Sequence, residues 1–195
     1  MYLTVFKMTR SSILNSSHTL DIYNSNAVHQ LLTGRQDTSR SEGKILYRII
    51  DTGKEIYLYI QTKEPFNREG IESRGLVFVK EMAFDFSNLQ GVFEFDVQVF
   101  PDKCDNTTGK RYFLKDNIER CKWLQRQFDK GGITLMNCTE YKISDICINK
   151  NKSVNVPTAS YRGKIYVKDS ERAKALFENG LGRCKNYGLG LILIK

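Results

Sequence analysis

Residues 178–195, ENGLGRCKNYGLGLILIK, close the chain with a glycine-rich loop and an apolar run. Glycine allows backbone turns with positive φ and close approach by another chain. Free backbone N–H groups beside cations suit phosphate oxygens, and an aromatic ring offers a stacking face for a base. The run Leu189–Ile194 is expected to be a buried strand that fixes the loop to the core. The residues predicted to bind a nucleic-acid backbone here are Gly180, Gly182, Arg183, Lys185 and Tyr187.

The order of elements around this loop differs from that of nucleotide-binding phosphate loops. A helical stretch, Ser170–Phe177, precedes the loop and a strand follows it. Phosphate loops of nucleotide enzymes run strand, loop, helix, and need Lys followed by Ser or Thr, or GxGxxG at a helix start. No nucleotide cofactor is therefore expected. A glycine-rich turn without any ligand is the plainer alternative to nucleic-acid binding.

Two stretches of the chain show the same order of expected elements, with Ser87–Gly91 between them. The first has strands at Tyr2–Lys7, Ile45–Ile50, Glu55–Thr62 and Val77–Phe86, and helices at Asn24–Thr33 and Glu69–Ser73. The second has strands at Val92–Phe100, Ile133–Ile148, Ser160–Val167 and Leu189–Ile194, and helices at Lys115–Lys130 and Ser170–Phe177. Gly70 and Gly75 weaken the pattern for the helix at Glu69–Ser73.

The order strand, helix, strand, strand, helix, strand is that of a ferredoxin-like unit. The predicted fold is α+β, with two tandem ferredoxin-like (RRM-like) domains whose antiparallel sheets carry helices on one face. We expect an N-terminal domain at 1–88 that carries a histidine helix. A C-terminal domain at 92–195 would carry a basic surface and the glycine-rich loop.

Charge is distributed unevenly along the 195 residues. The chain has a net charge of +8, and residues 91–195 contribute +7 of it, from 19 Lys and Arg against 12 Asp and Glu. A basic half beside a nearly neutral half favours a polyanionic partner. The alternative is a solvated surface without such a partner.

The five cysteines and two histidines show no metal-binding spacing. No CxxC pair occurs, so no metal site is expected. An odd number of cysteines without a signal peptide favours reduced thiols and a cytoplasmic location, since the start MYLTVFKMTR lacks the apolar core of a secretory signal. No run of about 18 apolar residues occurs, so no membrane span is expected.

His29, on the expected helix Asn24–Thr33, is the first candidate for proton transfer. Histidine exchanges a proton near neutral pH. RNA cleavage by a 2′-hydroxyl needs proton transfer at the attacking and leaving oxygens and charge stabilisation at the phosphate, and it needs no metal ion. Arg35, beyond the helix end, and Tyr23, near its start, are further catalytic candidates. The alternatives are a structural histidine and a partly buried tyrosine, and His18, in a polar loop, favours a solvated role.

Other basic residues are candidates for phosphate contact. They are Lys110 and Arg111 after Gly109, Lys115 at the start of the helix expected at Lys115–Lys130, and Lys152 in the segment NKNKSVNV. Cations near phosphates supply affinity without reading sequence. A solvated surface position is the alternative for these residues, and for Lys152 it is the usual one. Trp123 and Leu124 are expected in the core.

Four segments of the chain, taken together, resemble one known family. They are MYLTVFKM at the start, VHQLL followed by KILYRI, GKRYFLK with KWLQRQFDKGGITL, and YRGKIYV with NGLGRCKNYGLGLILI at the end. In order and spacing they are similar to the CasE family, the CRISPR repeat-processing endoribonucleases of the type I-E Cascade complex. The segments span most of the chain, and the last is the most specific.

The resemblance implies metal-independent cutting of CRISPR precursor RNA at the base of the repeat hairpin. The expected ends are a 2′,3′-cyclic phosphate or 3′-phosphate and a 5′-hydroxyl. The resemblance also implies that His29 is catalytic and that Lys152, ahead of the YRGKIYV strand, stabilises the phosphate. The crRNA hairpin, which such enzymes often retain, and other Cascade subunits are the implied partners, with no cofactor.

The chain departs from the family pattern at two positions. Asn26 stands where relatives often carry a tyrosine, and Gly34 stands where some carry a lysine, with Arg35 next. Tyr23 lies about one further turn away. Either Arg35 and Lys152 share the charge stabilisation or the enzyme is slow. Two rivals remain: a non-catalytic RNA-binding subunit of a CRISPR ribonucleoprotein, and a nucleotide-dependent enzyme.

Overall fold

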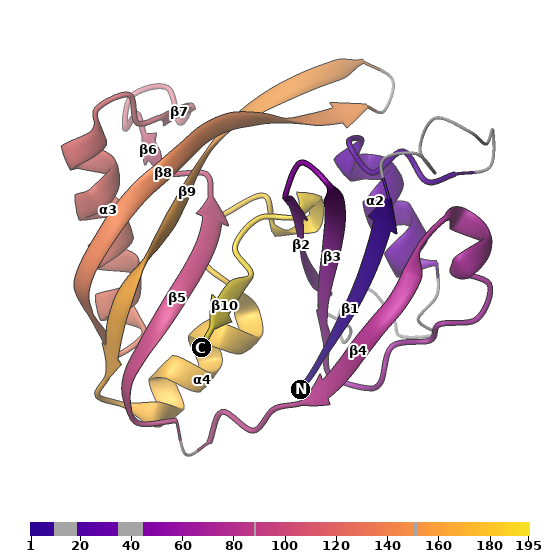
Figure 1. Ribbon diagram of the computed structural model, residues 1–195. Coiled ribbons are helices and arrows are strands. Elements are labelled where there is room, and N and C mark those ends of the chain that lie inside the picture. The colour runs from indigo at the N-terminus through magenta and orange to yellow at the C-terminus, as the bar shows by residue number, and fades with distance from the viewer. Residues whose placement is uncertain (10–18, 35–44, 88, 150–151) are drawn as a thin grey trace. The chain divides into compact units, whose positions relative to one another are not determined.

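The computed structural model describes residues 1–9, 19–34, 45–87, 89–149 and 152–195 (Figure 1). By their contacts the residues form two compact units. The first comprises Met1–Phe84, Ile146–Val154 and Asn186–Gly188, and the second comprises Asp85–Asp145, Asn155–Lys185 and Leu189–Lys195. The division into domains at 1–88 and 92–195 stays a prediction.

The first unit is built on a four-stranded sheet. Its strands are β1 (Tyr2–Thr9), β2 (Leu46–Asp51), β3 (Glu55–Thr62) and β4 (Val77–Ala83), in the order β2-β3-β1-β4 with antiparallel neighbours. Helix α2 (Ser25–Thr33) follows β1 in sequence, and the 3-10 turn η1 (Glu72–Arg74) precedes β4.

The core of this unit forms because apolar residues alternate along the strands and recur at helical spacing in α2. Met8 of β1 and Leu58 of β3 are buried, together with Val28 and Leu32 of α2. Apolar residues at every second position line one face of the sheet, and apolar residues at a spacing of 3.6 line one face of the helix. These two apolar faces form the core. The burial of Val28 fixes which way α2 faces, and thereby the position of its neighbour His29.

The second unit contains another four-stranded sheet. Its strands are β5 (Gly91–Val99), β8 (Ile133–Asn149), β9 (Ser153–Val167) and β10 (Ile192–Ile194), in the order β10-β5-β9-β8. The helices are α3 (Asn117–Lys130) and α4 (Ser170–Asn179), and a small hairpin pairs β6 (Asp102–Cys104) with β7 (Arg111–Phe113). A last 3-10 turn, η2, spans Lys185–Tyr187.

The two helices of the second unit begin at aspartate caps. The Asp116 carboxylate accepts the Glu119 N–H at 2.9 Å, and the Asp169 carboxylate accepts the Arg172 N–H at 3.1 Å. Such caps satisfy N–H groups that have no partner inside the helix. From α3, Phe128 packs edge-on against Phe95 of β5, with ring centroids 5.1 Å apart, so α3 covers the face of the sheet that carries Phe95.

Each sheet has the strand order of a ferredoxin-like unit, in which the first strand lies between the third and fourth. The predicted α+β class with two ferredoxin-like sheets is therefore confirmed. The expected helix at Glu69–Ser73 is only the single turn η1, which ends at Gly75 with φ of 79°. None of the described helices has the length and apolar character needed to cross a membrane.

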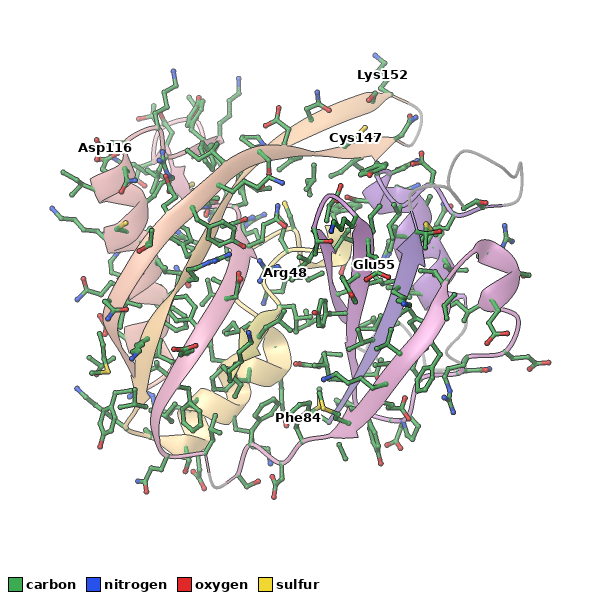
Figure 2. All side chains as sticks on the ribbon, viewed as in Figure 1. Arg48, Glu55, Phe84, Asp116, Cys147 and Lys152 are labelled. Atoms are coloured by element: carbon green, nitrogen blue, oxygen red, sulfur yellow. The ribbon has the colours of Figure 1, made fainter. Side chains whose placement is uncertain are left out.

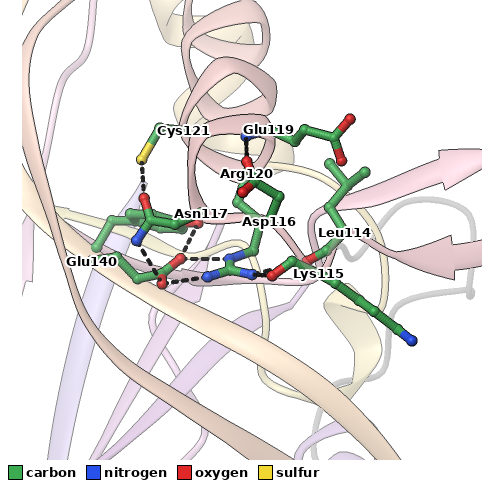
Figure 3. Close-up of polar contacts among 9 residues, drawn as sticks. Leu114, Lys115, Asp116, Asn117, Glu119, Arg120, Cys121 and Glu140 are labelled. Carbon is green, nitrogen blue, oxygen red and sulfur yellow. Dashed lines mark hydrogen bonds and ion pairs between the residues drawn. The ribbon is translucent and has the colours of Figure 1, made fainter.

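A buried ion pair joins α3 to the second sheet (Figure 3). Two nitrogens of Arg120 lie 2.6 Å and 2.7 Å from the two carboxylate oxygens of Glu140 on β8, and both side chains are less than a tenth exposed. Arg120 also donates to the carbonyls of Leu114 and Lys115, and the Tyr161 hydroxyl donates to Glu140. The network thereby fixes the segment ahead of α3 against β8 and β9.

Candidate active site

His29 lies on α2, one residue after the buried Val28, and its side chain is half-buried. Asn24 caps the start of this helix, and its side-chain oxygen accepts the Asn26 N–H at 3.1 Å. Near the other end, the Thr33 hydroxyl donates to the His29 carbonyl at 2.9 Å. The helix is capped and its residue Val28 is buried in the core, so the neighbouring imidazole of His29 has a defined position.

Tyr187, from the glycine-rich loop, lies against this histidine. The two ring centroids are 6.2 Å apart and the ring planes meet at 63°, an edge-to-face arrangement. Such ring pairs are favourable because the positive edge of one ring meets the negative face of the other. The structure thus brings together two residues that the sequence singles out from opposite ends of the chain.

Tyr47 of β2 supports both parts of this contact. Its ring is 1% exposed, and its hydroxyl donates to the Ser25 carbonyl in the first turn of α2 at 2.8 Å. Gly188 has φ of 86°, and a Cβ added there would lie 2.8 Å from the Tyr47 ring. Only glycine fits this position, because the backbone is left-handed and the ring leaves no room for a side chain. Burial raises the pKa of Tyr47 far above its usual value, so the hydroxyl stays a donor.

The end of the β8–β9 hairpin reaches the start of the same helix. Asn24 forms a parallel bridge with Cys147, and its side-chain oxygen also accepts the Asn149 N–H at 3.1 Å. The amide of Asn26 donates to the Asn149 carbonyl at 3.3 Å. Lys152 follows on the other side of this hairpin end, with its side chain exposed and directed outward (Figure 2).

Two other catalytic candidates are Tyr23 and Arg35. Tyr23 is 51% exposed, and its hydroxyl donates to the Asp51 carboxylate at the end of β2, at 3.3 Å. Its proposed role beside His29 stays a prediction. Arg35 lies outside the described residues, as does His18.

Three of the predicted RNA-binding residues, Lys110, Arg111 and Lys115, lie on and around the small β6–β7 hairpin of the second unit. Lys110 and Lys115 are exposed. Arg111 forms an ion pair with the largely buried Asp102 at 2.8 Å, and this hydrogen bond raises the pKa of the Arg111 guanidinium. A hollow of about 470 Å³ beside this hairpin is lined in part by Lys103, Tyr112 and Lys115. Basic and aromatic side chains therefore share one surface.

The glycines of the terminal loop serve close packing. Gly180 and Gly182 have φ of 68° and 74°, and a Cβ at Gly182 would lie 2.9 Å from the Trp123 ring. The Leu181 N–H donates to the Gly190 carbonyl at 2.8 Å, which closes the loop. Arg183 at the loop surface is exposed and Lys185 is half-buried.

The described residues include no group of three or more His, Cys, Asp or Glu side chains that could hold a metal ion.

Sequence comparison covers the entire chain. Residues 1–195 match the sequence model of a family described as "CRISPR associated protein". The chain belongs to this CRISPR-associated family. The resemblance found in the four sequence segments is thereby confirmed.

Three known proteins are similar to this CRISPR-associated protein in sequence or in fold. The CRISPR-associated endoribonuclease Cse3 of Thermus thermophilus is 29% identical over 113 residues, which is 51% of this chain and 54% of Cse3. The match thus spans about half the length of that relative. A CRISPR endoribonuclease Cse3 solved bound to a 19-nucleotide RNA has a TM-score of 0.90 at 22% identity, with all of both chains covered. A chain of a CRISPR RNA-guided surveillance complex gives 0.71 at 17%, covering 100% of this chain and 98% of that one.

Two residues of this CRISPR-associated protein that shape the site were not singled out by their sequence: Tyr47 and Asn149. Asn26 was noted only as a departure from the family pattern. Asn24 was expected only as the start of a helix. Asparagine at a helix start is a recognised capping signal, so the first bond of Asn24 follows from sequence. The second bond of Asn24, which it accepts from the Asn149 N–H, could not be predicted, because Asn149 lies 125 residues away in the sequence.

Proposed function

We propose that this CRISPR-associated protein is a metal-independent endoribonuclease that cuts CRISPR precursor RNA at the base of the repeat hairpin. The supporting observation is the convergence on one helix of His29, the ring of Tyr187 and the hairpin end that carries Lys152. One proton-transfer group, one aromatic face and one cation form a minimal set for cleavage by the RNA's own 2′-hydroxyl.

The reaction is a transesterification within the RNA. The 2′-oxygen loses its proton and bonds to the phosphorus, the bond from phosphorus to the 5′-oxygen breaks, and the leaving oxygen gains a proton. The products are a 2′,3′-cyclic phosphate, which can open to a 3′-phosphate, and a 5′-hydroxyl. His29 exchanges a proton at the 2′-oxygen or at the leaving 5′-oxygen, since imidazole is an effective acid and base near neutral pH.

Lys152 and Arg35 stabilise the negative charge on the phosphate in this proposal. Lys152 is exposed at a hairpin end that is fastened to the start of the His29 helix. A cation near the scissile phosphate stabilises the charge that develops on its oxygens in the transition state. Tyr23 is a further hydrogen-bond donor in this proposal.

RNA is bound through its shape and backbone. The major groove of A-form RNA is too deep and narrow for side chains to read the base edges, so proteins bind its phosphates and the 2′-hydroxyls in its shallow minor groove. The +7 charge of residues 91–195 supplies the attraction. Lys110, Arg111, Lys115, Arg183 and Lys185 contact the backbone in this proposal, while Tyr187, with Gly180 and Gly182 shaping its loop, offers a stacking face.

Two partners follow from the same proposal: the crRNA hairpin, retained after cutting, and the other Cascade subunits. Support comes from two proteins of similar fold, one an endoribonuclease bound to RNA and one a chain of an RNA-guided surveillance complex. We also place the protein in the cytoplasm, where precursor RNA is made and five free thiols stay reduced.

The chemistry is tested with a repeat hairpin RNA in EDTA. The expected result is cutting at the base of the stem, with a 2′,3′-cyclic phosphate or 3′-phosphate and a 5′-hydroxyl. A 2′-deoxy substitution at the scissile nucleotide should abolish cutting and leave binding intact, because the attacking group is gone. A 3′-hydroxyl with a 5′-phosphate, or cutting of the 2′-deoxy substrate, would overturn the proposal.

A non-catalytic RNA-binding subunit is the second candidate. The observation that favours it is Asn26, which stands where the family pattern often has a tyrosine and whose amide bonds to Asn149. Tight binding of the hairpin RNA without cutting under any of these conditions would select this candidate.

A further inference from the structure

Asn24, Asn26 and Asn149 form a small cluster of hydrogen bonds, here called the asparagine clamp. The Asn24 side-chain oxygen accepts two N–H groups, from Asn26 in the helix and from Asn149 at the end of β8, each at 3.1 Å. Its amide donates to the Asn149 carbonyl at 3.5 Å, and the Asn26 amide donates to the same carbonyl at 3.3 Å.

The clamp satisfies both backbone groups of Asn149 with side chains of another element. Asn149 is the last residue of β8, three positions before Lys152. These bonds hold the end of β8 against the start of α2. Asn26 is buried and Asn149 is exposed, so the bond between them lies at the boundary between the protein interior and the solvent.

We propose that Asn24 and Asn26 are positioning residues, which fix the hairpin end carrying Lys152 against the helix carrying His29. This inference rests on the proposed function. Neither asparagine contacts the RNA phosphate in this account; both act through Lys152. The cation and the imidazole reach the reacting phosphate from two segments far apart in the sequence, so their relative placement needs a direct link between those segments.

The inference also gives Asn26 a role that the family pattern does not. A tyrosine at this position has no amide to donate to the Asn149 carbonyl. If the chain had merely lost a tyrosine, Asn26→Tyr should raise the cleavage rate. Under the clamp, the same substitution removes a bond that positions Lys152 and lowers the rate.

The test is a double-mutant cycle on single-turnover cleavage of a hairpin repeat RNA. Asn26→Ala should slow cutting on the order of tenfold, since small misplacements of reacting groups are costly. The Kd for uncleaved RNA should stay within about twofold, since phosphate contacts elsewhere supply most of the affinity. In a Lys152→Ala background, Asn26→Ala should have little further effect, because residues that act through one another are not additive.

Matched variants separate positioning from folding. Asn24→Ser keeps a helix cap but is too short to reach Asn149, so it should slow cutting with α2 intact. Gln30→Ala, on the same helix and outside the clamp, should cut at the wild-type rate. Additive losses in the cycle, faster cutting by Asn26→Tyr, or wild-type cutting by Asn26→Ala would each overturn the inference.

Amide hydrogen exchange keeps this inference distinct from the proposed function. The Asn149 N–H donates to Asn24, so its exchange should be slow in the wild type and faster in Asn24→Ser. If the wild-type protein cuts no RNA, the proposed function fails whatever the exchange shows. If it cuts and the Asn149 amide exchanges equally in both proteins, the clamp fails and the proposed function stands.

Discussion

The ring of Tyr187 lies edge-on to the imidazole of His29, with the centroids 6.2 Å apart. This contact joins the glycine-rich end of the chain to the first helix of the first unit. It depends on Gly188, which packs against the same Tyr47 that bonds to the start of α2. A residue selected as a stacking surface for a base is therefore also a neighbour of the proposed proton-transfer group.

Removal of the Tyr187 ring should slow cleavage more than it weakens RNA binding. Tyr187→Ala deletes a ring pair worth about 0.5–1.5 kcal/mol and frees the imidazole to change rotamer. We expect a single-turnover rate lower by roughly tenfold. Tyr187→Phe keeps the ring and should stay near the wild-type rate. Equal losses in both variants would show that the hydroxyl, rather than the ring, matters.

Gly188→Ala should destabilise the first unit through a steric clash with Tyr47. The matched control is Gly53→Ala, which imposes a similar left-handed backbone, with φ of 88°, but meets no atom within 4 Å. Backbone strain alone costs about 1–2 kcal/mol. Urea denaturation should therefore show that Gly188→Ala loses clearly more stability than Gly53→Ala. Similar losses would mean that Tyr47 yields and that the packing is loose.

Glu140→Gln should lower stability at neutral pH, because it leaves the buried Arg120 without its counter-ion. Breaking one side of a buried ion pair typically costs about 3–5 kcal/mol. Arg126→Ala, an exposed residue on the same helix, is the control and should change the free energy of unfolding little. A Glu140→Gln protein as stable as the wild type would contradict the proposed weight of this pair.

The pH dependence of the same variant has a defined sign. The hydrogen bond from Arg120 lowers the pKa of Glu140 below its usual value. The unfolded chain then binds a proton at a higher pH than the folded one, so this contribution to stability is full above the usual pKa and is lost as the pH falls through the folded value. Stability curves of wild type and Glu140→Gln should therefore converge on acidification, and parallel curves would be contrary evidence.

Lys110→Ala combined with Lys115→Ala should weaken RNA binding and its dependence on salt. Each phosphate contact that is lost should reduce the slope of log K against log salt by roughly 0.7–0.9. Lys80→Ala, an exposed lysine on β4, is a control for loss of charge. Binding titrations at several salt concentrations measure both effects. If the double substitution left this slope unchanged, the hairpin would not be part of the RNA-binding surface.

Much of the fold follows from local patterns in the sequence. The helix at Asn117–Lys130 is framed by an aspartate cap and Gly131-Gly132, and the two sheets follow from strands separated by polar turns. The prediction placed a strand at Ser160–Val167, but β9 begins at Ser153. This extension contains polar residues such as Asn155 and Thr158, so it has no apolar strand pattern. It forms a strand because it pairs with a neighbouring strand, which its own sequence does not indicate.

The candidate site was only partly predictable. Histidine chemistry and the glycine-rich loop identified His29 and Tyr187 separately, but nothing local indicated that the two rings meet. The asparagine clamp could not be predicted from the sequence for the same reason, since only the tertiary fold brings Asn24 and Asn149 together. Contacts at such sequence separation come from topology, which single-residue patterns do not carry.

The most direct test is single-turnover cutting of a hairpin repeat RNA in EDTA by the wild type and by His29→Ala. His18→Ala, which removes the chain's other histidine, is the control. The account predicts that the wild type and His18→Ala cut, and that His29→Ala binds the RNA equally tightly without cutting. Cutting by His29→Ala at the wild-type rate, or tight binding without cutting by the wild type, would contradict it.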